Sequence, residues 1–179
     1  MTGGTILEVD GYRIQPFTSG GTFAVSAAGD GAEVEVLVVS GVGPGGNGLA
    51  GGGGGGGVIH ELNYAIAAGN YSVGVGNQSP TTGDRAGMTG SAANRGYDSN
   101  FGSLTAYGGG LGGWWNGVTG YAGGCGGGAG GGTSSNNRAE VAGGNPVNAA
   151  HGFQGGNGRR YPANNSNNHW GGGGGGAAG

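Results

Sequence analysis

The sequence predicts a mainly β and irregular protein without α-helix, in which a small antiparallel β layer packs against a stack of polyglycine-II helices. Three observations support this prediction. Glycine accounts for 55 of the 179 residues. Apolar residues alternate with period two in several N-terminal segments, as in half-buried strands. No stretch keeps the 3.6-residue period of a helix, because glycine interrupts every window.

The glycine runs require a physical explanation. Uninterrupted runs span residues 51–57 and 171–176, and a glycine-rich stretch spans 108–132. Ordering a glycine costs about 0.5–1 kcal/mol more than ordering an alanine, and glycine has no side chain to bury in return. It offers only a backbone donor and acceptor. Polyglycine II has three residues per turn and sends its hydrogen bonds to neighbouring helices, so the sequence predicts a core made of backbone.

The predicted strands lie mostly before the second glycine-rich stretch. Asp10-Gly11 marks a hairpin turn between the first two strands. The strand at 33–39 is apolar on both faces in its second half, so it is expected to be central and covered on both sides. The predicted strands cover residues 5–9, 12–15, 22–25, 33–39, 58–66, 71–75 and 101–107.

Two layers of one compact domain follow from this pattern. Residues 1–107 supply the antiparallel β layer and the first glycine run. Residues 108–179 form the polyglycine-II-rich layer, in which glycine runs alternate with polar and aromatic insertions. The insertions at 133–141 and 157–170 are predicted to be loops gathered at the ends of the body.

Composition excludes several classes of protein. Collagen is excluded because the chain has only five prolines and no G-X-Y period. The net charge of −3, without any lysine, gives no basic footprint for nucleic acid. No apolar stretch is long enough for membrane insertion. Residues 1–10 carry no secretory signal pattern, and the single Cys125 excludes an internal disulfide, so assembly inside a cell before release is expected.

No constellation of residues predicts an enzyme, a metal site or a cofactor. Residues 41–46 match the GxGxxG pattern after a strand, but Pro44 and the surrounding glycines prevent the helix that a dinucleotide site needs. The three histidines are too scattered for a metal motif. His60 is expected to be structural or at the surface, and Cys125 is expected to be a packed small residue rather than a nucleophile.

Large aromatic and arginine side chains in the insertions are the candidates for binding. They do not fit inside a glycine stack, so they must cap it, pack on the β layer or face outward. Exposed Trp, Tyr and Arg are the usual anchors of binding surfaces. The alternative is that they seal the ends of the stack from water. Sealing is the preferred interpretation for Trp114 and Trp115, and both interpretations stay open for the others. The receptor-contact candidates are Tyr97, Trp114, Trp115, Arg159, Arg160, Tyr161 and Trp170.

Five sequence blocks, in this order, resemble a known family. They are GYRI at 11–14, FTSGGTFAV at 17–25, VEVLVV at 34–39, AGNYSVGVG at 68–76 and SNFGSLTAYGGG at 99–110. The order of the blocks resembles the glycine-rich domain of bacteriophage tail-fibre and other virion proteins, and the architecture is similar to T-even-type tail-fibre adhesins. In that family an apolar strand usually follows the last glycine run. The resemblance therefore implies that another chain supplies this edge here, or that the β layer closes differently.

The resemblance implies a virion attachment protein, located in the virion or otherwise extracellular. Loops on a rigid scaffold would contact a host cell-surface protein or glycan, and the expected partners also include other virion proteins and further copies of this chain. The alternative is a purely structural, self-assembling subunit, such as a capsid decoration, a tail component or an extracellular filament, with no receptor of its own.

Overall fold

The computed structural model describes residues 5–78, 95–115, 117–134, 140–162 and 170–177. Within these ranges the chain forms short strands and extended segments and no helix, which confirms the mainly β class. No helix in these ranges could therefore cross a membrane. The strands are β1 (Leu7–Val9), β2 (Tyr12–Ile14), β3 (Gly21–Val25), β4 (Glu33–Val39), β5 (Val58–Ala65), β6 (Gly69–Gly74), β7 (Ser99–Phe101), β8 (Leu104–Ala106), β9 (Gly132–Ser134), β10 (Glu140–Val141) and β11 (Gly158–Pro162).

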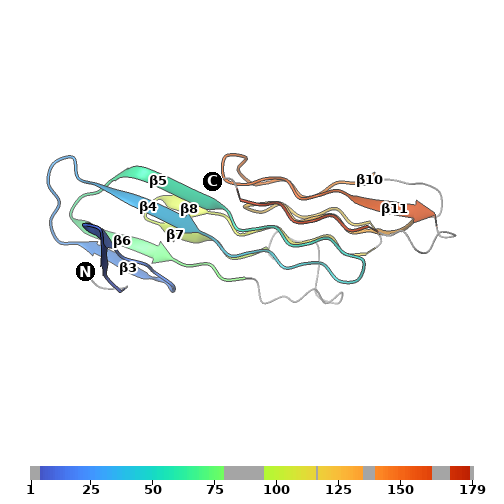
Figure 1. Ribbon diagram of the computed structural model, residues 1–179, viewed down its shortest axis with the longest axis horizontal. Coiled ribbons are helices and arrows are strands. Elements are labelled where there is room, and N and C mark those ends of the chain that lie inside the picture. Colours follow the sequence, from blue (N-terminus) through green and yellow to red (C-terminus); the bar gives the residue numbers. More distant parts are fainter. Residues whose placement is uncertain (1–4, 79–94, 116, 135–139, 163–169, 178–179) are drawn as a thin grey trace.

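The side-chain core lies at the N-terminal end of an elongated molecule (Figure 1). Strands β4 and β5 form an antiparallel pair, and β3, β6, β7 and β8 form an antiparallel sheet in that order. The two sheets contact each other through β4, β5, β7 and β8. Tyr71 and Phe101 stack face to face with ring centroids 5.8 Å apart. The buried core residues are Val36, Val38, Ile59, Val73, Phe101 and Ala106.

The hairpin β1–β2 stands apart from this core. Asp10 and Gly11 have φ angles of 49° and 82°, the pair of positive values that a type I′ hairpin turn requires, so the predicted turn is confirmed. Leu7 pairs with Ile14 across the hairpin, and neither β1 nor β2 contacts another strand of the described structure.

The strands continue directly into the glycine-rich part of the molecule. β4 leads into residues 40–46, residues 51–57 lead into β5, and β8 leads into residues 107–113 (Figure 1). Ser40 lies at this boundary, where its hydroxyl donates to the carbonyl of Tyr107 at 2.6 Å. A core of side chains at one end is thus joined to a body of backbone at the other.

The body consists of extended segments, called here the glycine segments: 40–46, 51–57, 107–113, 118–123, 124–131, 142–147, 153–158 and 170–176. Their hydrogen bonds run between segments with a period of three. The amides of Gly51, Gly54 and Gly57 all donate to segment 107–113, whereas those of Gly52 and Gly55 donate to segment 170–176. A three-residue period is the one that packed polyglycine-II helices would have, although the helix type itself stays a prediction.

Segment 124–131 is surrounded on all sides. From Cys125 to Gly130 its amides donate in rotation to three neighbours, and its carbonyls accept from segments 107–113, 142–147 and 170–176. Leu111, Cys125 and Ala129 are fully buried between the segments. The donors and acceptors of the rotation, with N···O distances of 2.8 to 3.1 Å, are Cys125 to Gly55, Gly128 to Gly52, Gly126 to Phe153, Ala129 to Gly156, Gly127 to Tyr121 and Gly130 to Val118.

Three expectations about the strands are wrong. β4 is not covered on both faces, since it pairs only with β5 and leaves Leu37 65% exposed. The strand expected at 101–107 is a hairpin of β7 and β8, because Gly102 adopts a φ of 53° and turns the chain. The insertions at 133–141 and 157–170 are not purely loops, because they contribute the three-stranded sheet of β10, β11 and β9.

Candidate functional site

Alternate connections between glycine segments lie at the end of the molecule opposite the side-chain core, called here the distal end (Figure 1). It comprises residues 47–50, 114–115, 117–118, 131–132, 140–141, 158–159 and 170. Backbone hydrogen bonds hold these connections together. The Gly131 amide donates to the Leu49 carbonyl at 2.8 Å, and the Trp115 amide donates to the Asn47 carbonyl at 3.3 Å.

Trp114 and Trp115 are half-buried at the distal end. The Trp114 ring stacks on Tyr121, with ring centroids 6.0 Å apart and an interplanar angle of 26°. Burial also raises the pKa of the Tyr121 phenol above its usual value of 10.0. The packing of Trp114 on Tyr121 favours the sealing interpretation for Trp114, and the contact roles of Trp114 and Trp115 stay predictions.

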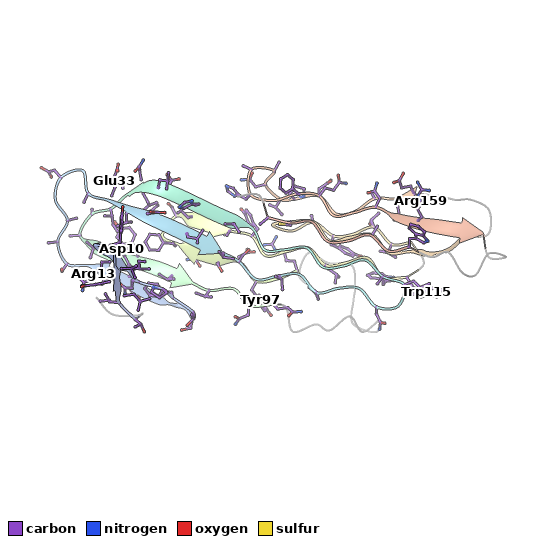
Figure 2. The ribbon with its side chains drawn as sticks, viewed as in Figure 1. Asp10, Arg13, Glu33, Tyr97, Trp115 and Arg159 are labelled. Carbon is purple, nitrogen blue, oxygen red and sulfur yellow. The ribbon has the colours of Figure 1, made fainter. Side chains whose placement is uncertain are left out.

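Tyr97 is separated from the other candidates. It lies along the side of the body, well away from Trp115 and Arg159 (Figure 2). Its side chain is 52% exposed, while its backbone bonds to Asn77 and Gly41. Tyr97 therefore does not share a surface with the distal residues.

Arg159 and Trp170 are brought together by the fold. Arg159 lies on β11 at the distal end (Figure 2), and its amide donates to the Trp170 carbonyl at 3.0 Å in an isolated antiparallel bridge. Directly opposed residues of an antiparallel pair point to the same face. Trp170 is 63% exposed and Arg159 is exposed as well, so the bridge holds two solvent-exposed residues on the same face.

Glu140 extends this pair into a row of three. It opposes Arg159 from β10. Because the Arg159 amide points toward Trp170, Glu140 lies across the other edge of β11 in a non-hydrogen-bonded pair, where side chains are closest. Its Oε1 accepts a hydrogen bond of 3.0 Å from the Asn157 side-chain amide, and Asn157 Oδ1 accepts from the Gly143 amide at 3.1 Å.

Arg160 and Tyr161 continue β11 and pair in parallel with Gly132 and Thr133 of β9. The side chains of Arg160 and Tyr161 lie outside the described part of the structure, so their predicted contact role stays a prediction.

The arginines differ in their partners. Arg95 makes an ion pair with Asp98, at 2.8 Å between Nη2 and Oδ2. Arg13 lies on the N-terminal hairpin, at the opposite end from Arg159 (Figure 2). Among the described residues, Arg159 forms no ion pair.

The residues weighed as catalytic or metal-binding candidates are dispersed. Cys125 is a buried free thiol, whose Sγ donates to the Gly56 carbonyl at 3.6 Å, and this confirms it as a packed small residue. Burial raises the pKa of the Cys125 thiol above its usual value of 9.0, although a backbone hydrogen bond with Phe153 opposes this shift. His60 is at the surface of β5 and bonds to Glu35 at 2.6 Å. Within the described ranges no cluster of three metal-binding side chains occurs.

Sequence reasoning missed Glu140 as a member of this row and Asn157 as its hydrogen-bond partner. Polar and apolar residues alternate around Glu140 only over residues 138–141, and β10 has only two residues. The row depends on pairing between segments far apart in the sequence, which no local pattern encodes.

Comparison with protein families identifies one match. The model of the family described as "Glycine-rich domain" matches residues 18–179, which is most of the chain. Comparisons with curated proteins and with solved structures give no match. The match begins within the segment before β3 and covers every glycine segment. The chain therefore belongs to the glycine-rich domain family.

Proposed function

We propose that the protein is a virion attachment protein of the tail-fibre or tail-tip adhesin type, which presents its distal end to a host surface receptor. One observation carries the proposal. At the distal end an exposed tryptophan lies beside an arginine that has no ion-pair partner among the described residues. Trp and Arg are the residue types most enriched at binding hot spots.

The glycine body supports this proposal by its rigidity. Binding costs less free energy when the contact residues are already held in place. The backbone of Trp170 is hydrogen-bonded to Arg159, and two residues later the Gly172 amide donates to the carbonyl of Ala129 in segment 124–131. The contact residues therefore extend from a fixed frame rather than from a flexible connection.

The resemblance of the five sequence blocks to virion proteins supports the choice of partner. A host cell surface is the target that such proteins reach. The net charge of −3 and the absence of lysine from the sequence do not favour nucleic acid as a partner. No catalytic role is proposed.

The proposal is tested by binding of fluorescently labelled protein to a panel of bacterial cells, measured by flow cytometry. The double variant Arg159→Ala/Trp170→Ala is expected to lose binding. The matched control is Arg13→Ala/Phe153→Ala, which removes an arginine and an exposed aromatic ring that both lie outside the distal end. Equal binding by both variants, or no binding to any envelope tested, would contradict attachment through the distal end.

A second function, that of a purely structural self-assembling subunit, is favoured by separate observations. The outer face of β4 and β5 exposes Leu37 and Leu62, the latter to 60%. On the hairpin, Leu7, Val9, Tyr12 and Ile14 are all exposed. Apolar surface of this kind is typical of interfaces, and a second copy of the chain would cover it.

Light scattering coupled to size-exclusion chromatography tests this second function. A self-assembling subunit is expected to elute as an oligomer, and Leu37→Ser/Leu62→Ser is expected to shift it toward monomer. A wild-type protein that stays monomeric at high concentration would rule out self-assembly by this route.

A further inference from the structure

Three side chains with complementary binding chemistry form one row at the distal end. Glu140, Arg159 and Trp170 come from three separate chain segments and are paired in register across β10, β11 and the bridge at Trp170. Opposed residues on neighbouring strands have Cβ atoms about 4.5–5.5 Å apart, so the whole row spans roughly 10 Å. This is the size of one or two sugar rings.

Each member of the row offers a different interaction. Ionised Glu140 only accepts hydrogen bonds, and Arg159 only donates them. A sugar hydroxyl both donates and accepts, so it satisfies either neighbour. The exposed indole of Trp170 offers a flat apolar face, against which the C–H face of a pyranose ring can pack.

The carboxylate of Glu140 is positioned before any ligand arrives. Asn157 donates to Glu140 Oε1, and Asn157 is itself oriented by the amide of Gly143. Through this chain of bonds the backbone sets the position of the acceptor, which lowers the entropy cost of binding.

The charges of the row select the kind of sugar. Glu140 and Arg159 carry opposite charges side by side, so the row has no net charge. A carboxylate or phosphate drawn to Arg159 would also meet the like charge of Glu140, which disfavours it. We propose that the row formed by Glu140, Arg159 and Trp170 binds a neutral pyranose ring of a surface glycan. This inference rests on the proposed attachment function and assigns the chemical class of its receptor.

The direct test is a binding assay on immobilised oligosaccharides, with neutral hexose and N-acetylhexosamine chains compared with uronate and sialate chains. Binding to at least one neutral chain is expected, with little dependence on salt. Trp170→Ala and Arg159→Ala should each weaken it by about tenfold or more, as expected for a hot-spot residue. Trp170→Phe should retain part of the affinity, because it keeps an aromatic face.

The control variants are Arg13→Ala on the N-terminal hairpin and Phe153→Ala, an exposed aromatic residue outside the distal end, which should bind like the unchanged protein. Stronger binding to the acidic chains, with a steep loss of affinity in salt, would overturn the inference. Neutral-sugar binding that is insensitive to all row variants would overturn it as well.

Treated cells separate this inference from the proposed function. Periodate cleaves vicinal diols of sugars, whereas protease removes surface proteins. Cell binding that periodate abolishes and protease spares is the expected result. Binding that protease abolishes and periodate spares would overturn the glycan inference and leave attachment standing. An absence of cell binding by the unchanged protein would instead refute attachment itself.

Discussion

Gly54 faces the carbonyl oxygen of Cys125 so closely that a Cβ at Gly54 would overlap that oxygen. The clash is with backbone, which is fixed at both residues. The Gly54 amide donates to the Gly110 carbonyl, and the Cys125 carbonyl accepts from the Gly110 amide. Neither segment can retreat without breaking hydrogen bonds to a third segment.

Gly54→Ala is therefore expected to destabilise the protein, and Gly127→Ala, which would overlap the Leu111 carbonyl, should do the same. Overpacking typically costs about 1–3 kcal/mol. For a chain of this length such a cost lowers the melting temperature by roughly 2–4 °C per kcal/mol, which calorimetry can measure.

Gly173→Ala is the matched control from the same kind of run, because nothing lies within 4 Å of a Cβ at Gly173 and its φ is not positive. It should stabilise the protein by about 0.4–1 kcal/mol through the unfolded state. A rise in melting temperature for Gly54→Ala and Gly127→Ala as well would show that the glycine segments are not packed as described.

Trp114→Ala should reduce stability and leave binding intact. The half-buried Trp114 ring packs on Tyr121, and aromatic pairs contribute about 0.5–1.5 kcal/mol beyond the area they bury. Urea denaturation should show a loss of roughly 1–3 kcal/mol. Trp170→Ala provides the reverse comparison, since Trp170 is largely exposed. If Trp114→Ala abolished cell binding without loss of stability, Trp114 would be a contact residue after all.

Stability should decline in alkali because of Cys125. Its pKa is raised by burial above 9.0, so the folded state keeps the thiol proton after the unfolded state has lost it. The stabilisation is fully present below the unfolded pKa and is lost as pH rises toward the folded pKa. The free energy of unfolding should fall by up to about 1.4 kcal/mol per pH unit above pH 9 from this group.

Cys125→Ala should flatten this decline, even though the variant is less stable overall. Tyr121 shifts in the same direction, so some alkaline loss remains in the variant. Equal slopes for the two proteins between about pH 8 and 10 would mean that the thiol ionises as freely in the folded state as in the unfolded state.

Asp98→Asn should destabilise the junction between the β layer and the glycine body. Asp98 binds Arg95 through both carboxylate oxygens and accepts from the Gly108 amide at 2.8 Å, while the Arg95 guanidinium lies 5.4 Å from the centre of the Tyr107 ring. Hydrogen bonds to charged groups contribute about 1.5–3 kcal/mol, and this partly exposed group should lie at the lower end. A double-mutant cycle with Arg95→Ala measures the coupling.

Glu35→Gln is the comparison for that cycle. The Glu35–His60 pair is exposed at the surface, and such pairs contribute about 0–1 kcal/mol. If Glu35→Gln lowered the unfolding free energy as much as Asp98→Asn, the Arg95–Asp98 pair would stabilise the protein no more than an exposed surface pair does.

Most strands of the β layer could be predicted from the sequence, because alternation of apolar and polar residues is a local pattern. Alternation at β4 and β5 and the Asp10-Gly11 turn gave these elements nearly to the residue. The covering of β4 was predicted wrongly, because an apolar pattern shows which face avoids water but not whether this chain or another one covers it.

The distal row could not be predicted for a different reason. Arg159 and Trp170 were recognised by residue type, yet their juxtaposition depends on a single backbone bridge between them. Glu140 joins through a two-residue strand. Glycine segments carry few side chains that would distinguish one neighbour from another, so local sequence patterns do not show which runs lie side by side.

The threefold rotation of partners along segment 124–131 has a consequence for how such a chain can change in length. One inserted or deleted glycine would turn every later residue of the segment by a third of a turn and direct its amide to the wrong neighbour. Three glycines would restore the original sequence of partners. The runs can therefore lengthen only in triplets, whereas the connections between them can vary residue by residue. In a family with this glycine body, the segments would change length in steps of three residues, whereas the connections at the distal end could vary in length and sequence.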